Sequence, residues 1–180
     1  VGSEMCIRDS LGTAHAVLSC KKFYTKSKKD ILILYADNPF IDQEIIKNMV
    51  NLKKKNNSDI VLLAVNTNKK NEYGRILLDE EDKVKKIVEF KDATNDQKRV
   101  SLCNSGIMLL KSEVLKKLIT KIRPRNKKKE YYLTDIIELA NKNSFKVDYI
   151  KSNFLKTLGV NTKQELAIAE EYFQNLSLIH

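Results

Sequence analysis

The stretch LILYADNPF, residues 32–40, decides how the rest of the chain is interpreted. It begins as an unbroken apolar run of strand length and ends in a carboxylate, an amide and a proline. A run without polar alternation is typical of a strand covered on both faces, as in a parallel sheet. Because a lone buried carboxylate is costly, Asp37 is expected at the strand end, facing solvent, a cation or a hydrogen-bond donor.

Two roles for Asp37 fit this position. Ligands of open parallel sheets bind outside the carboxyl ends of the strands. A carboxylate there suits Mg²⁺, which takes one or two protein oxygens and fills its other positions with phosphates and water. The other role is an ordinary turn, in which Pro39 ends the ladder and Asn38 permits the bend. Spacing alone leaves both roles open.

The flanking sequence alternates between helix and strand signals. Residues 42–55 carry apolar residues at helical spacing, with Asp42 as the expected N-cap, and residues 59–65 form a second apolar run. Two such strands around a helix predict a βαβ unit and a sheet that is at least partly parallel. Further strands are predicted near 73–79, 83–91, 104–111 and 146–151, and further helices over 13–23, 112–122, 133–142 and 162–176.

No repeat and no long linker interrupts this pattern, so residues 11–176 are expected to form one α/β domain. The first ten residues, VGSEMCIRDS, look like translated adaptor sequence and are expected to be a non-native leader. Residues 177–180 are expected to be a tail.

Composition excludes several classes of protein. The net charge of +10 comes from lysines scattered through the chain, which favours a solvated surface, or a basic rim for a phosphorylated small substrate, over a nucleic-acid binder. Three cysteines without metal-ligand spacing indicate neither disulfides nor zinc, and fit a reducing cytoplasm. No apolar stretch approaches the roughly 18 residues of a membrane span.

Other polar or glycine-containing positions each have two interpretations. Gly12 and Thr13 open a helix, where a phosphate or nucleobase can approach, or they form a simple turn. Asn161 precedes the last helix and equally fits a helix cap. No nucleophile has a convincing partner base. Gly74 fits a bulge or a ligand contact, and Glu89 and Asn104 fit sugar hydroxyls or turn capping.

Seven motifs, taken in order, resemble the uridyltransferase domain of bacterial bifunctional N-acetylglucosamine-1-phosphate uridyltransferases. They are LGTAHAVL, ILILYADNPFI, YGRI, VEFKDAT, CNSGIM, EYYLTDII and LGVNTKQELA, and the resemblance covers about residues 11–175. It implies a Rossmann-like α/β nucleotide-diphospho-sugar transferase fold with a mixed, mainly parallel sheet. It also implies a cytoplasmic enzyme that transfers UMP from UTP to N-acetylglucosamine 1-phosphate. The products would be pyrophosphate and the UDP-N-acetylglucosamine used for peptidoglycan and lipopolysaccharide.

The resemblance assigns roles residue by residue. It makes Asp37 and Asn161 the Mg²⁺ ligands and the catalytic residues, and it places Gly12 and Thr13 at the uracil. It makes Tyr35, Gly74, Glu89, Asn104 and Thr134 contacts of the sugar. The implied reaction is an in-line attack of the sugar phosphate on the α-phosphorus, which requires positioning and charge neutralisation but no protein nucleophile.

The chain departs from the family at three positions and at both ends. Ala36 replaces a glycine, Leu102 replaces an acidic or polar residue, and Asn38 replaces an apolar residue. Neither the opening glycine-rich strand-loop-helix that grips the triphosphate nor a C-terminal acetyltransferase domain, through which a parent protein could form a homo-oligomer, is recognised. We therefore expect a fragment with little or no turnover alone and with exposed apolar surface at residues 31–34 and 60–65.

Two alternatives stay open. One is another sugar-1-phosphate nucleotidyltransferase, using glucose 1-phosphate or a cytidylyl acceptor, which Glu89, Asn104 and EYYLTDI disfavour. The other is a non-catalytic nucleotide-sugar-binding module, which would bind a UDP-sugar without turnover.

Overall fold

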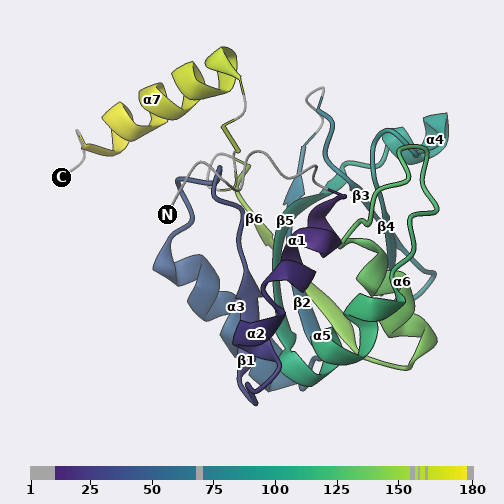
Figure 1. The fold of residues 1–180 in the computed structure, drawn as a ribbon. Coiled ribbons are helices and arrows are strands. Elements are labelled where there is room, and N and C mark those ends of the chain that lie inside the picture. The colour runs from purple at the N-terminus through teal and green to yellow at the C-terminus, as the bar shows by residue number, and fades with distance from the viewer. Residues whose placement is uncertain (1–10, 68–70, 155–156, 158, 161, 178–180) are drawn as a thin grey trace.

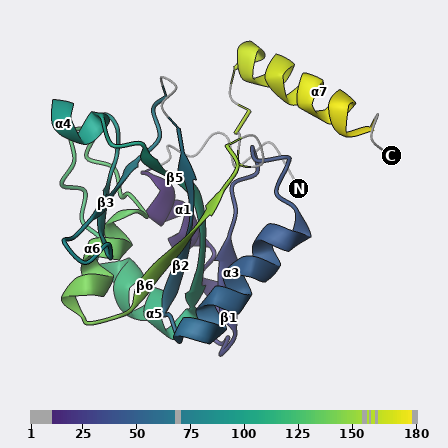
Figure 2. The same cartoon turned by 180° about the vertical axis from the view of Figure 1, so that it is seen from behind.

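A computed structural model describes residues 11–67, 71–154, 157, 159–160 and 162–177 (Figure 1). Helices cover both faces of a single sheet (Figures 1 and 2). The strands are β1 (Asp30–Ile33), β2 (Ile60–Asn66), β3 (Arg75–Leu78), β4 (Val84–Val88), β5 (Leu102–Lys111) and β6 (Val147–Ser152). The helices are α1 (Thr13–Ser19), α2 (Lys21–Tyr24), α3 (Gln43–Asn56), α4 (Asn95–Lys98), α5 (Ser112–Leu118), the 3₁₀ helix η2 (Ile119–Lys121), α6 (Asp135–Lys142) and α7 (Lys163–Ser177).

The sheet is mixed, as the resemblance implied. Its strand order is β4-β3-β5-β2-β6, with β1 also paired to β5. Strands β1, β2, β3 and β6 point the same way, so the sheet is mainly parallel in direction. Among the described strands, however, only β2 and β6 are direct parallel neighbours, because β5 lies antiparallel between β1 and β2. The expected βαβ unit is therefore split by a strand from later in the chain.

Strand β5 organises the molecule because both of its edges are used. One edge pairs with β2 over most of its length. The other edge is shared: β3 pairs with it at Cys103, and β1 pairs with it from Met108 to Lys111. Between these two pairings, residues 104–107 have no strand partner on that edge. The carboxyl end of β1 and the start of β3 therefore diverge at one point, which is where ligands bind in open sheets.

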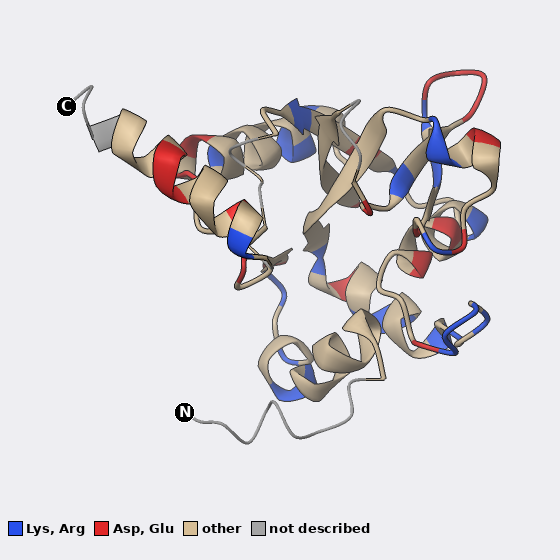
Figure 3. Ribbon diagram, turned by 90° about the horizontal axis from the view of Figure 1, so that it is seen from above, with Lys and Arg blue, Asp and Glu red and all other residues tan. Residues whose placement is uncertain are grey.

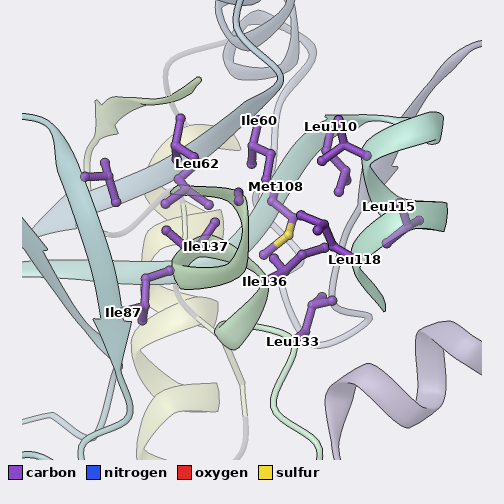
Figure 4. Close-up of a cluster of buried hydrophobic side chains, with 14 of the residues drawn as sticks. Ile60, Leu62, Ile87, Met108, Leu110, Leu115, Leu118, Leu133, Ile136 and Ile137 are labelled. Atoms are coloured by element: carbon purple, nitrogen blue, oxygen red, sulfur yellow. The ribbon is translucent and has the colours of Figure 1, made fainter. Parts of the chain in front are cut away.

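Alternate residues of β2 and β5 supply the two sides of the core. Val61, Leu63, Ile107 and Leu109 pack against helix α3 on one face. Ile60, Leu62, Met108 and Leu110 face the other helices, where they meet Leu115, Leu118, Ile136 and Ile137 of α5 and α6 (Figure 4). Each fully buried Leu or Ile contributes about 1.5–3 kcal/mol. This two-sided burial explains why neither strand alternates polar with apolar residues.

The expectation of exposed strand surface is right for β1 and wrong for residues 60–65. Strand β1 pairs only with β5 among the described residues, and Leu34 is 46% exposed. An apolar groove of about 520 Å³ runs along its outer edge, next to Val17 and Phe23. Residues 60–65 are instead fully buried, since β5 and β6 pair with β2 on both sides.

Two helix starts match the sequence predictions. The Asp42 carboxylate accepts a hydrogen bond from the Ile45 N–H at 2.8 Å, which caps α3. Thr162 accepts one from the Glu165 N–H at 3.1 Å at the start of α7. Helix α7 extends from the body of the molecule (Figures 1 and 2) and touches it through an edge-on contact of Phe40 with Tyr172.

Basic side chains are spread over several helices and loops and do not form one stripe (Figure 3). This distribution matches the scattered lysines of the sequence. Within the described part of the chain, no helix is both long and apolar enough to cross a membrane.

Candidate functional site

The candidate site is a cavity of about 270 Å³ where β1 and β3 diverge along β5. Six residues singled out from the sequence line it: Thr13, Tyr35, Asp37, Gly74, Glu89 and Asn104. Its other lining residues are Asn38, Glu72, Tyr73, Ser105, Gly106, Tyr132 and Gly159.

Tyr35 forms the floor of the cavity because Gly106 lets its ring approach the backbone of β5. Gly106 has a φ of +87°, and a Cβ there would lie 2.1 Å from Cε2 of Tyr35. Burial, followed by the nearby carboxylates of Glu89 and Asp37, raises the pKa of Tyr35 to about 12. The phenol is therefore neutral at physiological pH and offers the cavity a polar hydroxyl on an aromatic wall.

Asp37 lies in a turn just beyond β1, and this turn is bound to a distant segment. The Val160 N–H donates to the Asp37 carbonyl at 2.9 Å. The Asn38 Nδ2 donates to the Thr157 carbonyl at 3.0 Å. Asn161, the second proposed metal ligand, lies outside the described residues. The two bonds thus bring the residue before Asn161 against Asp37, although some 120 residues separate them in the chain.

A buried arginine holds the wall opposite the turn. Arg75 is 4% exposed, and its guanidinium donates to the Asn71 Oδ1 at 2.8 Å and to the Tyr73 carbonyl at 2.6 Å. It also lies 5.1 Å from the centre of the Phe90 ring. Since Gly74 and Glu89 are chain neighbours of these residues, Arg75 positions two sides of the cavity.

Glu89 and Asn104 face the cavity with different partners. The Thr134 hydroxyl donates to the Glu89 Oε1 at 2.8 Å, and burial raises the pKa of Glu89 in spite of that bond. Asn104 donates its backbone N–H to the Gly74 carbonyl at 2.8 Å, while its side-chain Oδ1 is buried without a partner. Thr134 is buried and does not line the cavity, so it acts on the cavity through Glu89.

Gly12 and Thr13 hold the start of α1 against the segment before α6. A Cβ on Gly12 would lie 2.5 Å from the Tyr131 carbonyl oxygen, so this close approach requires glycine. The Leu133 N–H donates to the Thr13 hydroxyl at 2.8 Å. Thr13 reaches the cavity, whereas Gly12 packs behind it.

Tyr73 and Tyr132 line the cavity but were not selected from the sequence. Tyr132 belongs to the motif EYYLTDII, so its motif was a signal for it. Tyr73 belongs to the motif YGRI, so its motif was a signal for it as well, and the Arg75 guanidinium binds its carbonyl.

The first residue of α6 provides a prediction about stability. Burial, then the carboxylates of Glu138, Glu89 and Asp92, raise the pKa of Asp135 to about 6 from 3.8. Between these two pH values the unfolded chain has lost its proton and the folded chain retains it, so Asp135 makes stability fall as pH rises from about 4 to 6. The full shift corresponds to about 3 kcal/mol, which solvent screening of this partly exposed group reduces to about 1 kcal/mol.

We therefore expect Asp135→Asn to stabilise the protein at pH 7 by about 1 kcal/mol and to change little at pH 3.5. Urea unfolding followed by far-UV circular dichroism at both pH values measures this. Equal effects of the substitution at the two pH values would contradict the prediction.

The charge of the cavity is one-sided. Asp37, Glu72 and Glu89 contribute carboxylates, and no lysine or arginine is among the described residues that line it. A phosphate would be repelled from such a surface unless a cation accompanied it. No group of three or more His, Cys, Asp or Glu side chains among the described residues could hold a metal unaided.

Comparison with known proteins supports a family assignment. The family model described as nucleotidyl transferase matches residues 4–154. The bifunctional protein GlmU of Ruegeria sp. (strain TM1040) is 36% identical over 166 residues, and that of Buchnera aphidicola subsp. Baizongia pistaciae is 41% identical over 165 residues. These alignments cover 92% and 91% of this chain, and the chain spans 36% of the length of each relative.

Two solved structures share the fold. A UDP-glucose pyrophosphorylase without ligand matches with a TM-score of 0.69 at 15% identity, over 90% of this chain and 60% of that one. A putative glucose-1-phosphate thymidylyltransferase from Bacillus anthracis matches with a TM-score of 0.60 at 19% identity, over 80% of this chain and 54% of that one. The family model covers more than half of the sequence, and so the chain belongs to the nucleotidyl transferase family.

Proposed function

We propose that the chain carries the sugar-binding part of a uridyltransferase that joins UMP from UTP to N-acetylglucosamine 1-phosphate. The observation that supports this most is the single cavity in which Tyr35, Asp37, Gly74, Glu89 and Asn104 meet. These residues come from four separate stretches of the chain. A polar, partly aromatic cavity of this size suits a hydroxylated ring more than an apolar ligand.

The residues also fit Mg²⁺, which we propose as the cofactor. Asp37 supplies one hard oxygen to a cavity whose described lining residues include no basic side chain, and Mg²⁺ needs only one or two protein oxygens when phosphates and water fill its other positions. We propose Asn161 as the second ligand, because it follows Val160, whose N–H binds the Asp37 carbonyl. Bound there, the ion would neutralise phosphate charge.

The protein's own part in the reaction is positioning. Glu89, fixed by the Thr134 hydroxyl, can accept a hydrogen bond from a sugar hydroxyl, and Tyr35 and Tyr132 can pack against the ring. Such contacts hold the sugar phosphate for in-line attack on the α-phosphorus of UTP, with pyrophosphate as the leaving group. This chemistry requires no protein nucleophile. We propose a cytoplasmic location, where both substrates are available.

Calorimetric binding to the 180-residue chain tests this proposal. With Mg²⁺ present, UDP-N-acetylglucosamine should bind at least about tenfold more tightly than UMP, because only the former fills the sugar cavity. UDP-glucose, which lacks the acetamido group, serves as the comparison for sugar choice. Equal affinity for UMP and both UDP-sugars would contradict the proposal, and preference for UDP-glucose would favour the alternative substrate.

A further inference from the structure

Asn38 combines three properties that no role assigned above explains. It lines the cavity next to Asp37, its Nδ2 donates to the Thr157 carbonyl at 3.0 Å, and its Oδ1 is buried without a hydrogen-bond partner. A turn-forming role for Asn38 requires its backbone and does not require a buried amide.

The bond to Thr157 fixes which way the amide lies. If the amide were flipped, its oxygen would face the Thr157 carbonyl oxygen, and two acceptors would repel each other. The Oδ1 is therefore the unpaired atom in the stable orientation. Buried acceptors in native proteins are almost always paired, so an unpaired one beside a cavity needs an explanation.

A second residue that lines the same cavity has an amide oxygen in the same state. The Oδ1 of Asn104 is also buried without a partner. Of the three side-chain atoms in this condition among the described residues, two therefore belong to one cavity, and the third is the Tyr24 hydroxyl outside it. Two unmet acceptors suit a ligand that brings O–H or N–H donors, such as a sugar.

We propose that Asn38 is a ligand-contacting residue whose Oδ1 accepts a hydrogen bond from a hydroxyl or amide N–H of the bound sugar phosphate. This inference rests on the proposed function and deepens it. A ligand donor that reached the buried Oδ1 would supply the hydrogen bond that this acceptor lacks in the free protein.

A double-mutant cycle, in which both the protein side chain and the ligand group are varied, tests the contact. The wild-type chain and Asn38→Leu, which has nearly the same shape, are titrated with N-acetylglucosamine 1-phosphate. The ligand series adds its 3-, 4- and 6-deoxy analogues and glucose 1-phosphate, which lacks the acetamido group. Asn48→Leu, at an exposed position on α3, is the matched control. If circular dichroism shows that Asn38→Leu folds poorly, Asn38→Ala replaces it, and the same loss of affinity is expected.

We expect Asn38→Leu to bind N-acetylglucosamine 1-phosphate about three- to tenfold more weakly than wild type, which is the usual effect of one hydrogen bond. The analogue that lacks the hydrogen-bond donor should bind wild type more weakly than the parent ligand does, by a similar factor. Asn38→Leu should bind this analogue and the parent ligand with equal affinity. Unchanged affinity of Asn38→Leu, or an equal loss for every ligand, would overturn the inference alone. Failure of the wild type to bind the parent ligand would instead overturn the proposed function.

Discussion

Gly106→Ala should remove ligand binding and lower the free energy of unfolding by about 2–4 kcal/mol, since overpacking and backbone strain act together. The new Cβ would lie 2.1 Å from Cε2 and 2.6 Å from Cδ2 of Tyr35. The ring must then move into the cavity, because β5 behind it is paired on its other edge and packed in the core. The φ of +87° adds strain that no side-chain movement relieves.

Since the chain has no tryptophan, urea unfolding followed by far-UV circular dichroism measures the loss of stability. Calorimetry with UDP-N-acetylglucosamine measures binding. The double variant Gly106→Ala with Tyr35→Ala separates the two causes, because it removes the clash and keeps the backbone strain. Gly106→Ala should therefore lower the free energy of unfolding less when it is introduced into Tyr35→Ala than when it is introduced into the wild type. Near-wild-type stability and binding of Gly106→Ala would show that Tyr35 does not depend on this glycine.

The sequence predicted most elements well, and its errors concern neighbours in space. The apolar run at 31–35 predicted a strand buried on both faces, but β1 ends at Ile33 and Leu34 is 46% exposed. An apolar sequence pattern predicts that a segment can be buried, but it does not show which other segment covers it. The same limit explains residues 60–65, whose burial between β5 and β6 depends on strands from much later in the chain.

Residues of the candidate site could be predicted where a sequence motif contains them. Roles that depend on a contact between segments far apart in the chain could not be predicted. Asp37, Gly74, Glu89 and Asn104 lie in quoted motifs, and the fold brings them to one cavity. Arg75 also lies in a quoted motif, but its role in holding the cavity wall was not predicted, because its partners at Asn71 and Phe90 appear only in three dimensions. The unpaired amide oxygen of Asn38 could not be predicted from the sequence either, since its orientation depends on the bond from Nδ2 to the carbonyl of Thr157.

Asp37→Asn should weaken ligand binding in the presence of Mg²⁺ and should not weaken it in the absence of Mg²⁺. With Mg²⁺, the variant loses the charged oxygen that would hold the ion, and we expect UDP-N-acetylglucosamine to bind at least about tenfold more weakly than to wild type. In EDTA, the carboxylate of the wild type repels the diphosphate in a cavity that has no basic side chain among its described lining residues. Removing that charge should make the variant bind as tightly as wild type, or more tightly.

Asp96→Asn is the matched control, because it removes the same charge from an aspartate whose side chain is 93% exposed, on α4 and away from the cavity. Its affinity should equal that of wild type in both buffers, apart from a small long-range effect that 0.15 M salt screens. Calorimetric titrations of the three proteins, each with Mg²⁺ and with EDTA, give the six affinities needed. If Asp37→Asn weakened binding equally in both buffers, Asp37 would contact the ligand itself, and its proposed role in holding the cation would be wrong.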